Sequence, residues 1–93
     1  MKARALLAWN VRRLRVQRGI SQEKLARMAG IDRSYLGGLE RQTENPTVDL
    51  LDRIAGALGT HPSDLFVRPR KGAGPPKTLP TGRKPAQSTR SQL

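Results

Sequence analysis

The chain has 93 residues, of which 35% are hydrophobic and 3% aromatic, and its formal net charge is +11. A chain of this length holds one small domain, which excludes a large enzyme or a multidomain receptor. Because it has no cysteine, disulfides, thiolate zinc sites and cysteine nucleophiles are also excluded, and the fold depends on packing alone.

The charge and the hydropathy pattern bear on where the protein works. No apolar run approaches the roughly 18 residues that a membrane span needs, and polar Asn10 and Arg12 interrupt the apolar stretch near the N-terminus too soon for a secretory signal. We therefore expect a cytoplasmic protein that makes no membrane contact. The sequence pI of about 11.7 points to a polyanionic partner, most often nucleic acid.

The first half of the chain predicts two helices. One is expected from about Ala3 to Arg18, because apolar residues recur there at helical spacing and a glycine follows (Leu7, Val11, Leu14, then Gly19). Ser21 is a good N-cap for a second, short helix that ends before Gly30.

Three more helices are expected behind these two. Asp32 can cap a third, with the loop of Asn45 and Pro46 after it. Thr47 can cap a fourth, which ends before a glycine and whose apolar residues share one stripe (Leu50, Leu51, Ile54, Ala55 and Leu58). Pro62 opens a fifth of one or two turns. Since no strand is expected, the prediction for residues 1–67 is a compact all-α domain of five helices.

The C-terminal segment differs from this domain in composition. Residues 68–93 contain seven Lys or Arg and no Asp or Glu, whereas residues 1–67 contain eleven against seven. The segment also holds five of the seven prolines and only two large aliphatic residues, too few to offset the entropy of ordering it. We expect a disordered basic tail, which is either a solubilising extension or an arm that adds non-specific phosphate affinity.

The segment from Gln22 to Arg41 is the most informative part of the chain. Two helices that cross steeply over a short turn need small or apolar residues where they approach and a permissive backbone in the turn. The seven positions concerned all hold a residue of the required kind: Leu25, Ala26, Ala29, Gly30, Ile31, Leu36 and Leu39.

The stretch ISQEKLARMAGIDRSYLGGLERQTENPTVDLLDRIAGALG, with HPSDLF after it, resembles the Cro and phage-repressor (XRE) type helix-turn-helix family. The resemblance covers about Val11 to Phe66, and within the family the chain is similar to small stand-alone regulators, including restriction-modification controller proteins. It implies a repressor-like domain that binds operator DNA as a two-fold dimer. The function implied is therefore sequence-specific regulation of transcription, not enzyme catalysis.

The resemblance assigns roles to four residues near the turn. Gln22 matches a residue that hydrogen-bonds DNA phosphate, although it could also be a solvated surface glutamine. Arg33 and Ser34 open the recognition helix (residues 32–41), whose side chains reach base edges in the major groove. Arg33 could pair with guanine or contact a phosphate, whereas Ser34 discriminates poorly between bases. Tyr35 could reach a phosphate or a thymine methyl group, or it could cover the turn.

The recognition helix also departs from the family pattern. Gly37 and Gly38 replace polar side chains, and each glycine costs about 1 kcal/mol in helix propensity. Either the bare helix approaches DNA more closely or this surface no longer contacts DNA. Gln42 stands where a left-handed glycine commonly ends the helix, and Glu44 would repel a nearby phosphate. Arg41 and the basic tail could compensate for this repulsion.

Two further pairs of residues have expected roles. The resemblance pairs Arg15 of the first helix with Glu40 at the end of the recognition helix, as a structural ion pair. Trp9 and Val16 fall opposite the apolar stripe of the first helix, so they form a candidate partner or dimer contact. The alternative is that Trp9 packs against the fourth or fifth helix or against the start of the tail.

Catalytic and cofactor chemistry find no support in the sequence. His61, Ser63 and Asp64 diverge from one short turn and cannot align as a nucleophile, a base and an orienting acid. A lone histidine offers no second metal ligand, and the glycines lack a phosphate-loop context, so we expect neither a metal ion nor a nucleotide cofactor.

Two functional hypotheses follow. In the first, a homodimer places two copies of the helix at 32–41 in successive major grooves of double-stranded DNA, and the fourth and fifth helices, with Leu65 and Phe66, form the dimer contact. In the second, the same fold binds another regulator through Trp9, Val16 and Tyr35. The glycine pair and Glu44 favour the second hypothesis, whereas the charge and the intact turn favour DNA.

Overall fold

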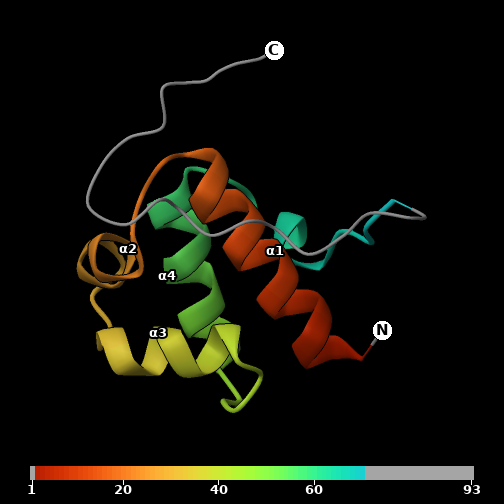
Figure 1. The fold of residues 1–93 in the computed structure, drawn as a ribbon, viewed down its shortest axis with the longest axis horizontal. Helices are drawn as coiled ribbons and strands as arrows, with labels where there is room; N and C mark the ends of the chain where they lie inside the picture. Colours follow the sequence, from red (N-terminus) through yellow and green to blue (C-terminus); the bar gives the residue numbers. More distant parts are fainter. Residues whose placement is uncertain (1, 71–93) are drawn as a thin grey trace.

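The computed structural model describes residues 2–70, and these form an all-α domain of four helices and one 3-10 helix (Figure 1). The elements are α1 (Ala3–Gln17), α2 (Gln22–Ala29), α3 (Arg33–Glu40), α4 (Val48–Leu58) and the 3-10 helix η1 (Pro62–Phe66). The predicted all-α class and its first four helices are confirmed. Residues 68–70 have no regular structure, and the rest of the predicted disordered tail lies outside the described residues.

The helices start where the sequence places their caps. Ser21 Oγ accepts a hydrogen bond from the backbone N–H of Lys24 at 3.0 Å, and Asp32 Oδ1 accepts one from Ser34 at 3.2 Å. Thr47 Oγ1 accepts one from Leu50 at 3.1 Å. Each cap satisfies a backbone donor that has no partner inside its own helix, which contributes about 1 kcal/mol to stability.

The fifth predicted helix is a 3-10 helix and not an α-helix. The N–H of Asp64 donates to the carbonyl of His61 at 2.9 Å, three residues back, which is the 3-10 pattern. The Asp64 carboxylate accepts hydrogen bonds from the Thr60 hydroxyl and from the His61 N–H. These two bonds lower the pKa of Asp64 and fasten the carboxylate to the two residues that precede η1.

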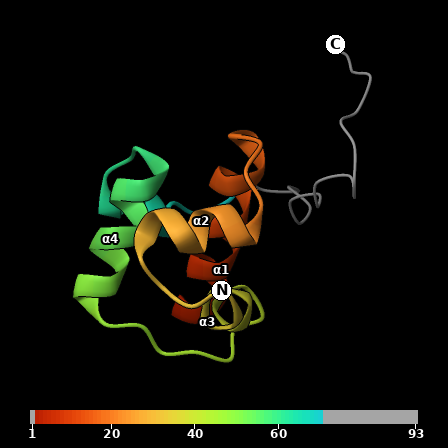
Figure 2. The same ribbon diagram turned by 90° about the vertical axis from the view of Figure 1, so that its left-hand side faces the viewer.

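The core is aliphatic and draws on every element. Four leucines and isoleucines from α2, α3, α4 and η1, together with Val11 of α1, are fully buried at its centre (Leu25, Leu36, Ile54, Leu65 and Val11). In Figures 1 and 2, α1 runs along one side of the domain while α2 and α4 lie on the other, and α3 closes one end. The burial of Leu65 corrects the expectation that it lies on a dimer surface.

One buried polar side chain links the two ends of the domain. Asn10 of α1 is fully buried, and its Nδ2 donates to the carbonyl oxygens of Leu6 at 3.0 Å and Val67 at 2.9 Å. Its Oδ1 accepts from Arg13 Nε at 3.2 Å and Nη2 at 2.8 Å. The backbone that leaves η1 is therefore bonded to the middle of α1, 57 residues earlier in the chain.

Candidate nucleic-acid interface

Helices α2 and α3 cross steeply. In Figure 1 α2 is seen end-on while α3 is seen from the side, and in Figure 2 the two views are exchanged. Between them Gly30 has a φ of +71°, and the N–H of Ile31 donates to the carbonyl of Ala26 at 2.9 Å. This is the left-handed glycine end of a helix, with the carbonyls of the last turn satisfied by the residues that follow.

A side chain from α4 holds this turn from the outside. Arg53 Nε donates to the carbonyl of Ala29 at 3.1 Å, and its Nη2 donates to the carbonyl of Gly30. A Cβ atom at position 30 would lie 2.9 Å from Arg53 Nη2, but that guanidinium ends a flexible side chain, so the positive φ is what requires glycine here. Arg53 could not be identified from the sequence, because its contacts join residues 23 and 24 positions apart.

The far end of α3 is fixed by a buried charge network. Arg15 Nε lies 2.8 Å from Glu40 Oε2 and Arg15 Nη2 lies 3.1 Å from Oε1, while the third nitrogen, Nη1, donates to the carbonyl of Ile20 at 3.0 Å. Gln22 Nε2 also donates to Glu40 Oε1 at 3.1 Å. Side chains of α1 and α2 thus meet on one carboxylate of α3 and set the position of that helix.

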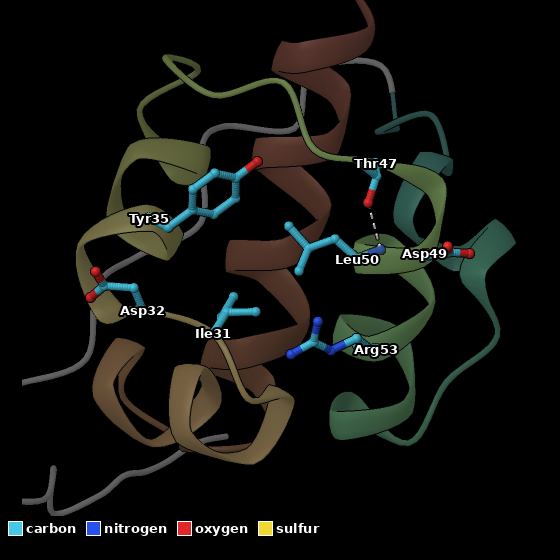
Figure 3. A pocket seen from close by; sticks show the side chains of 7 residues that line it. All are labelled: Ile31, Asp32, Tyr35, Thr47, Asp49, Leu50 and Arg53. Carbon is cyan, nitrogen blue, oxygen red and sulfur yellow. Dashed lines mark hydrogen bonds between the residues drawn. The ribbon is translucent and has the colours of Figure 1, made fainter.

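At the other end of α3, the side chains are exposed. Arg33 and Ser34 are exposed, whereas Tyr35 is half-buried. The Tyr35 ring points into an open pocket of about 350 Å³ between α3 and α4, which Ile31, Leu50 and Arg53 also line (Figure 3). Of the predicted DNA contacts, Arg33 and Ser34 are therefore exposed at the N-terminal end of α3, and Tyr35 is turned towards α4 (Figure 3).

The two glycines of α3 lie beneath polar side chains. A Cβ atom at position 37 would lie 3.1 Å from Arg41 Nη1 and 3.8 Å from Gln22 Oε1, and one at position 38 would meet side chains of the loop after α3. That loop starts at Gln42, which has the left-handed φ of +68° usually taken by glycine. The face of α3 that carries glycine in the sequence is covered by neighbouring polar groups in the structure.

The candidate partner surface on α1 is only partly exposed. Trp9 and Val16 are half-buried, and the Arg13 guanidinium lies 5.3 Å from the centre of the Trp9 ring, within the range of a cation–π contact.

Residues 2–70 contain no cluster of three metal-ligating side chains. None of the helices in these residues is long and apolar enough to cross a bilayer.

A short helix, a glycine turn and a second helix with exposed basic and polar side chains at its start define a helix-turn-helix domain. The helix-turn-helix family model HTH_3 matches residues 11–65, and the chain belongs to this family. It is therefore a helix-turn-helix transcriptional regulator and not an enzyme.

The chain is similar to a transcription factor and to a control protein. It is 41% identical over 68 residues to a hypothetical transcription factor of Neisseria meningitidis, a match that covers 73% of this chain and 64% of the relative. It is 40% identical over 68 residues to the control protein C.SmaI of Serratia marcescens, covering 73% of this chain and 81% of the relative.

Two solved structures extend the comparison. The crystal structure of the restriction-modification controller protein C.AhdI from Aeromonas hydrophila matches with a TM-score of 0.66 and 40% identity, covering 68% of this chain and 96% of that one. The C.Esp1396I controller, crystallised as a tetramer in complex with its natural 35 base-pair operator, matches with a TM-score of 0.65 and 27% identity, covering 71% of this chain and 87% of that one.

Proposed function

We propose that this regulator binds operator DNA by placing the N-terminal end of α3 in the major groove, and that it works in the cytoplasm as a homodimer. The observation that carries the proposal is how α3 is held. Arg15 and Gln22 both bind Glu40 at one end of the helix, while Arg33 and Ser34 are exposed at the other. Side chains that contact base edges need a rigid support and a free end, and α3 provides both.

The side chains divide into two groups by their chemistry. Arg33 is the base-reading residue, because a guanidinium can donate to both O6 and N7 of guanine, and Ser34 adds a less selective contact beside it. Gln22, at the start of α2, and Arg41, at the C-cap of α3, contact phosphates and position the helix. Tyr35 contacts a phosphate or a thymine methyl group from the edge of its pocket.

The proposed dimer contact is an apolar groove between α4 and η1. The groove has a volume of about 520 Å³, and Val48, Leu51, Pro62 and Phe66 form its apolar lining. Val48 is 81% exposed and Phe66 is 40% exposed, and large apolar side chains left open together mark an interaction surface. A two-fold dimer would place its two α3 helices about 34 Å apart, one turn of DNA.

The basic segment completes the proposal. We divide the chain into a helix-turn-helix domain of residues 1–67 and a tail of residues 68–93, as the composition predicts. Seven cationic side chains with no carboxylate among them would add phosphate contacts that do not depend on the DNA sequence. Affinity then comes from the tail and the phosphate contacts, and discrimination comes from α3.

The experiment that tests this function is selection of bound sequences from a random double-stranded DNA pool at two salt concentrations. We expect a short inverted repeat to be enriched at both concentrations, with a protein that sediments as a dimer at micromolar concentration. Enrichment of no sequence, with all binding lost at the higher salt concentration, would overturn the proposal. A monomer that still selects the repeat would overturn only the dimer.

A second candidate function is binding of another regulator through the α1 face. The observation that favours it is that Trp9 and Val16 are incompletely buried. Trp9 is the only tryptophan of the chain. If the DNA pool gives no enrichment, this face is the next to test, by substituting Val16 with glutamate and measuring loss of a captured protein partner.

A further inference from the structure

A carboxylate from outside α3 occupies the place of a missing α3 side chain. An ideal Cβ atom at Gly38 would lie 2.8 Å from Glu44 Oε2, 2.9 Å from Glu44 Cγ and 2.9 Å from Thr43 Oγ1. Since real Cβ atoms do not come within 3.0 Å of such neighbours, the Glu44 side chain rests directly on the backbone of Gly38. A side chain at position 38 would displace Glu44 from this place.

The backbone of the loop produces this arrangement. Gln42, at a φ of +68°, turns the chain back, and the N–H of Thr43 then donates to the carbonyl of Gly38 at 2.8 Å. The Thr43 hydroxyl donates to the same oxygen at 3.0 Å. Two hydrogen bonds thus fix the residue that precedes Glu44 against the last turn of α3.

The position of Gly38 places Glu44 on the proposed DNA face. Gly38 follows Ser34 by four residues, so the two share one face of the helix. Beside it, the space over Gly37 is filled by Arg41 and Gln22, the two residues proposed above to contact phosphates. The Glu44 carboxylate makes no hydrogen bond or ion pair with the described residues, so its oxygens are available as acceptors.

We propose that Glu44 is a specificity-determining residue, which accepts a hydrogen bond from the exocyclic amino group of a cytosine in the major groove. The inference rests on the proposed binding of DNA through α3. A carboxylate only accepts hydrogen bonds, and it is repelled by the acceptors of guanine (O6 and N7) and thymine (O4). Adenine offers an amino group but sets the N7 acceptor beside it. Cytosine is therefore preferred over adenine, and both are preferred over the other two bases.

The test compares base preference, because a carboxylate that only repels phosphate would change affinity equally on every sequence. Wild type and Glu44→Ala are selected on the same random pool, and their affinities are measured on the selected site and on its three single-base variants at each position. We expect Glu44→Ala to lose a cytosine preference of about 5- to 150-fold at one position of each half-site, with the other positions unchanged. Its affinity for non-specific DNA should rise.

Two further variants separate positioning from charge. Gly38→Ala keeps Glu44 but takes away its place on α3, so the same cytosine preference should fall while the melting curve shows a folded protein. Glu23→Gln removes an exposed carboxylate from the first turn of α2 and should leave every base preference unchanged. If Glu44→Ala raises affinity uniformly and the selected motif is unaltered, Glu44 is only a repulsive charge and the inference is wrong. If the wild type selects no motif, it is the proposed function that fails.

Discussion

The buried pair of Arg15 and Glu40 allows the sharpest test of how α3 is held. Arg15 is only 4% exposed, and two of its three hydrogen-bonding nitrogens depend on the Glu40 carboxylate. In Glu40→Ala the guanidinium stays buried with these two nitrogens unpaired. Breaking a buried pair on one side costs about 3 to 5 kcal/mol, a large part of the 5 to 15 kcal/mol that typically stabilises a domain.

The assay is urea unfolding followed by far-UV circular dichroism, with a thermal melt beside it. A loss of 3 kcal/mol would lower the Tm by about 12 °C or more, because each kcal/mol is worth about 4 to 8 °C in a domain of this size. The double variant Arg15→Met with Glu40→Leu removes both charges and should be more stable than Glu40→Ala alone, since apolar replacement of a whole buried pair is often nearly neutral.

Two results would refute this reasoning. If Glu40→Ala costs less than about 1 kcal/mol, the pair behaves as an exposed one and α3 is held by apolar packing instead. If the double variant loses as much free energy of unfolding as Arg15→Met and Glu40→Leu lose together, the two charges do not interact. The folded double variant should also bind DNA less tightly, because Gln22 loses the acceptor that orients its amide.

The remaining predictions concern single substitutions. Gly56→Ala should stabilise the domain by about 1 kcal/mol in the same urea assay, because a Cβ atom there meets nothing within 4 Å; Gly59→Ala, at a φ of +69°, should destabilise it. The lowered pKa of Asp64 means that its carboxylate contributes stability above about pH 3.8, the ordinary value, and that this contribution disappears as the pH falls through the folded pKa. Asp64→Asn should therefore be less stable than wild type at neutral pH. The two stabilities should converge in strong acid, as unfolding measured across pH 2 to 7 would show. Arg33→Ala should cost about 1 to 3 kcal/mol on the selected site and less elsewhere in a fluorescence-anisotropy titration; an equal loss on all sequences would mean a phosphate contact. Val48→Glu should shift the sedimenting species to monomer without lowering the Tm by more than a few degrees.

Most of the architecture could be predicted because it depends on local patterns. The caps at Ser21, Asp32 and Thr47 and the apolar spacing within each helix lie within a few residues of one another, so the chain itself displays them. The fifth element was harder, since a five-residue segment that starts with proline satisfies both helix types. Of its two adjacent apolar residues, Leu65 is buried and Phe66 is exposed.

Contacts between distant segments were not predictable in the same way. Arg53 reaches the turn before α3, and Asn10 reaches Val67, across 23 or more residues, and neither side chain carries a local sign of its partner. The same holds at Gly38, which the sequence marks only as a departure from the family pattern. Its relation to Glu44 depends on the path of the loop, and that path depends on the unusual backbone of Gln42.

The hydrogen bond from Asn10 to the Val67 carbonyl makes Val67 part of the folded domain. A chain cut after Phe66 would keep every helix, yet one of the two Asn10 Nδ2 hydrogens would lose its acceptor while the other stays bonded to Leu6, at a cost of about 1 to 3 kcal/mol. A chain cut after Arg68 keeps that acceptor. Fragments for spectroscopy or crystallisation should therefore retain Val67, and fusion partners are best joined beyond it.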